Sequence, residues 1–141
     1  MDIEAVQRYL RAIHDDGRYA PAAFEFVREG LDFTARALFG QAPRAADDDE
    51  SRTPTPRHVS GQQLCKGLRR LALRRWGLLA PAVLARWNIR ATRDFGEIVF
   101  LLIELGLLGR QESDSIHDFQ DVYDFKTAFD LREIPLDAMD E

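Results

Sequence analysis

The chain has 141 residues, 45% of them apolar and 30% charged, with a formal net charge of −5 at pH 7. That length suits one compact domain with one core, and the composition is typical of a globular protein, which excludes disordered and membrane-embedded chains. The longest apolar run, residues 98–109, is shorter than the roughly 18 residues that cross a bilayer. We therefore expect no membrane partner.

The N-terminus and the cysteine content both indicate a cytoplasmic protein. Asp2 and Glu4 stand where a secretory signal needs a basic start and an apolar stretch. Cys65 is the single cysteine, so it cannot form an internal disulfide. We expect this thiol to be a small buried apolar group on its helix.

Two helices are predicted in residues 1–40. Apolar side chains recur at three-and-four spacing over residues 2–15, which indicates an amphipathic surface helix. Pro21 suits the first turn of a second helix, and Gly40 follows its last apolar residues. This second helix should span about 21–39 and pack on two sides.

Residues 41–56 are predicted to be a flexible acidic linker. They contain three prolines and the acidic run 47–50, and they lack a large apolar side chain. Such a segment buries too little surface to offset the entropy of ordering it.

The chain is expected to regain order at residue 57 and to form a helical core with a hairpin up to residue 130. Ser60 can cap a helix that Gln63 supports three residues later, and this helix should run to Trp76 and stop at Gly77. A short helix of about 79–87 should follow.

The next helix is predicted over 94–105, between a capping box of Asp94 and Glu97 and a glycine, Gly106. Its only charged side chains lie on one seam, so we expect it to be the centre of the core. It presents no Arg, Lys, Asn or Gln to base edges. Reading of the DNA major groove by this helix is therefore disfavoured.

Residues 107–111 and 121–125 are two short extended candidates that could pair as a hairpin, followed by an acidic tail at 131–141. Helix, short helix, turn, buried helix and hairpin is the order of a winged-helix module. The predicted fold is therefore mainly α, one compact helical domain that is winged-helix-like with a short C-terminal β-hairpin.

Charge is segregated along the chain. Residues 57–110 carry ten basic and three acidic residues, a net charge of +7, whereas residues 111–141 carry two basic and ten acidic residues, a net charge of −8. The helix of 61–76 contributes a stripe formed by Lys66, Arg69, Arg70 and Arg74. This stripe is either a solvated face paired with the protein's own acids or a contact site for phosphate or a partner.

Other chemistry finds little support in the sequence. The three histidines stand in no metal-ligand spacing, and four aspartates at 114, 118, 121 and 124 lack the glycine of a calcium loop. Ser60 lies near His58, but no nucleophile elbow surrounds it, so a helix cap is the better interpretation. We expect no cofactor, no metal and no catalytic residue.

Three segments resemble a family of small uncharacterised bacterial proteins reported chiefly from planctomycetes and verrucomicrobia. They are RHVSGQQL (57–64), TRDFGEIVFLLIELGLL (92–108) and, more loosely, DFQDVYDF (118–125). The chain departs from the family pattern at Cys65, Lys66 and Val122. The resemblance implies no activity, cofactor or catalytic residue.

The function that the sequence favours is a non-enzymatic helical module that binds another protein. The alternative is nonspecific nucleic-acid binding through the basic stripe of the helix 61–76, which the net charge of −5 disfavours.

Overall fold

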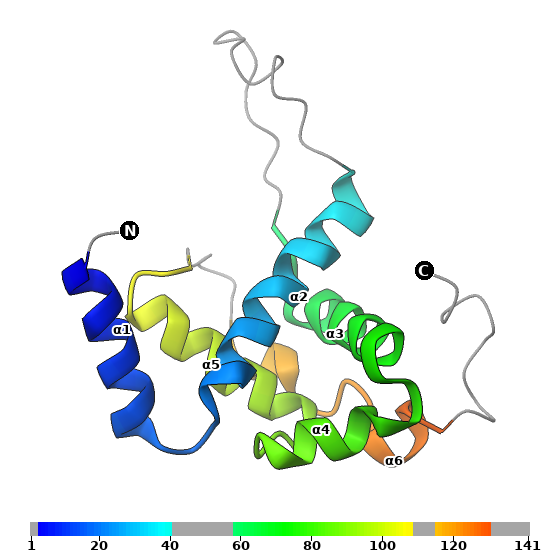
Figure 1. Cartoon of the computed structure of the whole chain (residues 1–141). Coiled ribbons are helices and arrows are strands. Elements are labelled where there is room, and N and C mark those ends of the chain that lie inside the picture. The colour runs from blue at the N-terminus through cyan, green and yellow to red at the C-terminus, as the bar shows by residue number, and fades with distance from the viewer. Residues whose placement is uncertain (1–2, 41–57, 109–114, 131–141) are drawn as a thin grey trace, which may run out of the picture.

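The computed structural model describes residues 3–40, 58–108 and 115–130, and within these ranges the chain is helical with no strand. The elements in chain order are α1 (Ile3–Asp16), α2 (Pro21–Phe39), α3 (Gly61–Trp76), the 3₁₀ helix η2 (Gly77–Leu79), α4 (Ala80–Arg86), α5 (Thr92–Glu104), η3 (Ile116–Phe119) and α6 (Phe125–Ala128) (Figure 1). The predicted linker 41–56 and the predicted tail 131–141 lie outside the described residues.

The sequence signals for α2 and α3 are confirmed. Pro21 opens α2, and Gly40 ends it with a φ of 74°, in the left-handed region where glycine is favoured. At the start of α3 the Ser60 hydroxyl accepts from the Gln63 amide at 3.1 Å, while the Gln63 side chain accepts from the Ser60 amide at 2.9 Å. This reciprocal pair is the predicted capping box.

A close crossing of α2 and α3 lies in the middle of the molecule (Figure 1). It is made possible by small residues, because a Cβ added at Gly67 would overlap the Thr34 hydroxyl and lie 2.8 Å from Thr34 Cβ. A Cβ at Gly30 would likewise overlap the Leu68 side chain. The crossing therefore fixes the position and rotation of α3 against α2.

Aromatic rings support the corner between α3 and α4. Phe26 of α2 lies 5.2 Å from the Trp76 ring and 5.7 Å from the Trp87 ring, and the two indoles are 5.4 Å apart. These centroid distances are favourable for aromatic pairs. The chain can therefore reverse direction after Trp76 without losing its packing against α2.

Helix α5 packs against α2, α3 and η3, which agrees with the prediction that it lies at the centre of the core. Phe95, Ile98 and Leu102 are fully buried, but Phe100 is half-buried. The helix also begins at Thr92, two residues before the predicted start. The Asp94 carboxylate reaches back to accept from the amides of Arg90 at 2.8 Å and Ala91 at 3.1 Å, so it closes the helix start from inside the first turn.

The second strand of the predicted hairpin, residues 121–125, is not formed, so this prediction is wrong. The winged-helix arrangement needs that hairpin and therefore finds no support. Asp121 turns the chain with a φ of 51°, and Asp124 caps α6 by accepting from the Lys126 amide at 3.0 Å. The Val122 amide donates to the Thr92 hydroxyl at 3.2 Å rather than to a neighbouring strand. Backbone groups that a hairpin would pair are thus used in turns and caps, while 109–111 of the first strand lies outside the described residues.

Candidate functional site

Helix α3 has the largest net charge of the described helices. The helix carries five basic residues and no acidic one. Lys66, Arg70 and Arg74 follow one another at four-residue spacing, which places them on one side of a helix. Leu64 and Leu68 on the other side are buried in the core. The close crossing with α2 fixes the rotation of α3 about its axis. The basic residues are therefore held on the side that faces solvent.

We call Lys66, Arg69, Arg70 and Arg74 the basic face; the structure holds two of its members by neighbouring groups. Arg69 Nε donates to the backbone carbonyl of Ala128 at 2.8 Å, which ties the end of α6 to α3. The Arg70 guanidinium lies over the Phe33 ring of α2, 5.9 Å from its centroid. A carbonyl dipole and a ring face thus contribute to orienting these two cations.

The other two members of the basic face point into solvent. Lys66 and Arg74 are exposed, and neither forms a salt bridge with another residue in the described ranges. The basic face therefore combines oriented guanidinium groups with cations that can rearrange to meet a partner.

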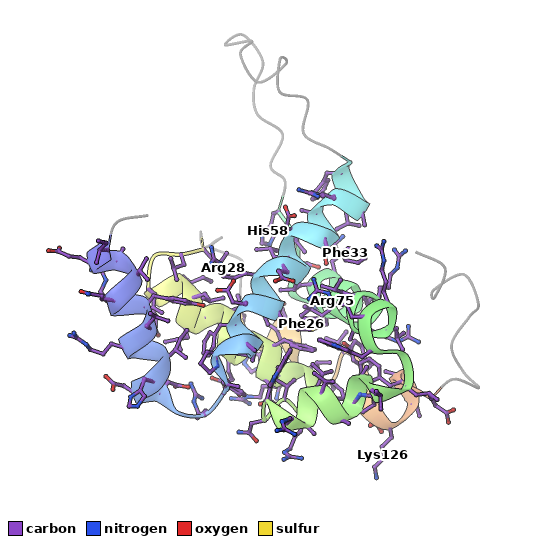
Figure 2. All side chains as sticks on the ribbon, in the orientation of Figure 1. Phe26, Arg28, Phe33, His58, Arg75 and Lys126 are labelled. Carbon is purple, nitrogen blue, oxygen red and sulfur yellow. The ribbon has the colours of Figure 1, made fainter. Side chains whose placement is uncertain are left out.

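Acidic residues on α2 supply only one counter-charge to α3. Glu29 pairs with Arg75, which lies along the side where α2 and α3 meet (Figure 2). Glu25 instead contacts Arg28 at 3.4 Å, and Asp32 contacts Arg36 at 3.3 Å. Pairing of α3 with the protein's own acids is therefore seen at Arg75, which is not one of the four residues of the predicted stripe.

Two exposed leucines follow the end of α3. Leu78 and Leu79 are 66% and 65% exposed, and Leu78 follows Arg74 by four residues. They belong to η2, and the preceding Gly77 has a φ of 53°, a backbone conformation that suits glycine. The sequence did not single out this pair, because a hydrophobic pattern alone would assign two leucines after Gly77 to the core.

A second candidate site is an open depression beside the start of α5, with a volume of about 320 Å³. Its lining side chains come from Arg90, Ala91, Asp121, Tyr123, Asp124 and Phe125. The Tyr123 hydroxyl already donates to the Cys65 carbonyl at 2.8 Å, and burial raises its pKa well above the usual value. A phenol held neutral in this way cannot act as a base near pH 7.

The nucleophilic and metal-binding candidates have structural roles or lie apart. The Ser60 hydroxyl is engaged in the capping box. Cys65 is fully buried, and burial raises the pKa of its thiol to about 12, so the thiol is protonated at neutral pH. Among the residues that the structure describes, no three His, Cys, Asp or Glu side chains are grouped as metal ligands.

Residues of the three segments that carry the family resemblance meet at η3. A Cβ at Gly61 would lie 2.8 Å from Asp118 Cβ, and one at Gly96 would lie 2.7 Å from the Phe119 ring. The Thr92 hydroxyl donates to the Phe119 carbonyl at 2.6 Å. These positions thus act in packing η3 against the beginnings of α3 and α5.

Two of the four aspartates that are close together in the sequence have local structural roles. Asp118 accepts from the Ser115 amide at 3.0 Å and so closes the start of η3, and Asp124 caps α6. Asp121 lies in the turn between them, whereas residue 114 lies outside the described ranges. Local backbone contacts thus account for the positions of Asp118 and Asp124.

None of the helices in the described ranges is both long and apolar enough to span a membrane. Comparisons of the chain with protein-family models, with curated proteins and with solved structures find no match.

Proposed function

We propose that this protein is a non-enzymatic interaction module that binds another protein through the basic face of α3. The observation that carries the proposal is the fixed presentation of exposed Lys66 and Arg74 on a helix that has no acidic residue. A partner that meets a rigid helix loses little conformational entropy in ordering it. Charged groups at such a surface steer association and select partners of opposite charge.

Existing roles of the reactive side chains support a binding function over catalysis. Ser60 caps a helix, Cys65 is a buried thiol, and Tyr123 donates to a carbonyl. A catalytic nucleophile needs an accessible group with a base within hydrogen-bond reach. Each of these three side chains instead has a structural role in the fold.

Nonspecific nucleic-acid binding through the same face is the second candidate, because cations at four-residue spacing can also meet phosphates. The net charge of −5 works against it, and so does Glu29 of α2 beside α3. Binding to arbitrary duplexes with a steep dependence on salt would distinguish this function from protein binding.

A charge-reversal experiment tests the proposed function. The double variant K66E/R74E should lose a partner that co-purifies with the wild-type chain at a fixed stoichiometry from the cells that express it. The matched control is R8E/R11E, which makes the same charge change on two exposed residues of α1 and should keep the partner. Equal recovery of the partner with K66E/R74E would show that α3 is not the contact surface.

A further inference from the structure

We propose that the basic face and the Leu78–Leu79 pair form one docking surface for an acidic peptide that carries leucine-like side chains. The inference rests on the proposed function and names the class of partner for the same surface. It joins two features that are consecutive in the chain: exposed cations on α3, and the exposed leucines of η2, which contacts α3.

The leucines are held outward by the packing beneath them. Ala80, directly after the pair, is fully buried, and so is Leu84 one turn later. Trp76 packs against Phe26 and Trp87 below the same corner. Turning Leu78 or Leu79 into the core would therefore displace side chains that are already well packed, so their exposure is a fixed property of this corner.

The surface has the dimensions of a short peptide. Lys66 and Arg74 are separated by eight positions of α3, and at 1.5 Å per helical residue this corresponds to about 12 Å. An extended peptide rises about 3.3 Å per residue, so roughly four residues would span the two cations, and the residues that follow would reach the leucines. Peptide carboxylates would then face Lys66 and Arg74 while an apolar side chain contacts the leucines.

Local charge favours an acidic peptide over an anionic membrane. A short peptide on α3 meets mainly the cations of this helix, whereas a membrane surface meets the field of the whole chain, whose net charge is −5. A basic peptide would be repelled by Lys66 and Arg74. The exposed leucines add an apolar contact that a phosphate backbone would not use.

The probe for the test is a fluorescein-labelled peptide of glutamates interrupted by three leucines, titrated with the full chain by fluorescence anisotropy. We expect binding that weakens with salt. Binding should weaken roughly tenfold or more in L78S/L79S and in K66E/R74E, a difference of about 1.4 kcal/mol or more. Replacing the leucines of the probe with serines should have an effect similar to that of L78S/L79S.

The control variant is I3S/L10S, which removes two other exposed apolar side chains, on α1, and should bind the peptide like the wild type. Circular dichroism of every variant shows that it is folded. Absence of peptide binding at low salt would overturn the inference, as would an equal effect of I3S/L10S. Tighter binding to phosphatidylserine vesicles through Leu78 and Leu79, not displaced by the peptide, would assign the surface to membranes instead.

The two proposals can fail separately. If capture of the cellular partner depends on Lys66 and Arg74 but not on Leu78 and Leu79, the proposed function stands and the acidic, apolar peptide is the wrong class of partner. If capture depends on none of these four residues, both proposals are wrong.

Discussion

The close crossing of α2 and α3 predicts that Gly67→Ala destabilises the protein, although alanine is the better helix former. At an open helical position this change would raise the free energy of unfolding by about 1 kcal/mol. Here the added methyl overlaps the Thr34 hydroxyl and lies 2.8 Å from Thr34 Cβ. Overpacking of this kind costs about 1–3 kcal/mol or more.

The Thr34 hydroxyl adds a second cost because it donates to the Gly30 carbonyl at 2.6 Å. Displacing it forfeits a hydrogen bond worth about 1 kcal/mol. Overpacking and the lost bond together outweigh the helix-propensity gain, so we expect a net loss of about 1–3 kcal/mol. Urea unfolding followed by the fluorescence of Trp76 and Trp87 measures it.

Two further variants test the reasoning. Gln62→Ala, at an exposed position of α3, should change the free energy of unfolding by no more than about 0.5 kcal/mol. The double variant T34A/G67A should lose less than the sum of its single changes, with a coupling energy on the order of 1 kcal/mol. A Gly67→Ala protein that is more stable than the wild type, or strict additivity in the cycle, would refute the crossing.

Other positions give four shorter predictions. Ser60→Ala should lower the free energy of unfolding by about 1 kcal/mol through the missing cap, with partner binding unchanged. Phe95→Ala should cost about 3–5 kcal/mol as a cavity in the core, and Phe100→Ala clearly less because its ring is half-buried; equal losses in thermal or urea unfolding would contradict this difference. Cys65 should react with a thiol reagent such as DTNB only after unfolding, since the buried thiol has a pKa of about 12; rapid labelling under native conditions would disprove it. Burial also raises the pKa of Tyr9 from 10.0 to about 12, so the folded state retains a proton that the unfolded state loses, and stability should fall as pH rises from about 10 to 12, with a smaller fall in Tyr9→Phe.

Helix boundaries were predictable where local signals decide them. Pro21 and Gly40 bracket α2, and Ser60 with Gln63 starts α3, because the bonds that satisfy a helix end come from residues within one turn of it. Asp94 was assigned to the wrong position for a related reason. A carboxylate can satisfy amides from the N-cap or, as here, from the first turn, and the sequence alone does not distinguish the two.

The hairpin prediction failed because short apolar segments have no period long enough to separate strand from turn. Residues 121–125 contain aromatic and β-branched side chains, which favour strands. In the structure the hydroxyl of Tyr123 reaches the Cys65 carbonyl, and the amide of Val122 reaches Thr92. These partners lie 58 and 30 residues away in the chain, so no local pattern could reveal them.

The basic face was predictable as a helical stripe, but its environment was not. Four-residue spacing placed Lys66, Arg70 and Arg74 on one side of α3. The partner of Arg69 is a backbone carbonyl, which carries no sequence signature, and the ring under Arg70 belongs to another helix. A hydrophobic pattern alone would assign Leu78 to the core. Its exposure depends instead on the turn that the chain makes at Gly77.

Different residues stabilise the fold and form the proposed docking surface. The first group lies in the segments that carry the family resemblance. Gly61, Thr92 and Gly96 pack η3 against two helices, so changing them should lower stability. Lys66 and Leu78 are exposed, so changing them should alter the free energy of unfolding by no more than about 0.5 kcal/mol. Stability and binding should therefore be separable by mutation, because the scaffold that orients α3 and the proposed contact surface are built from different residues.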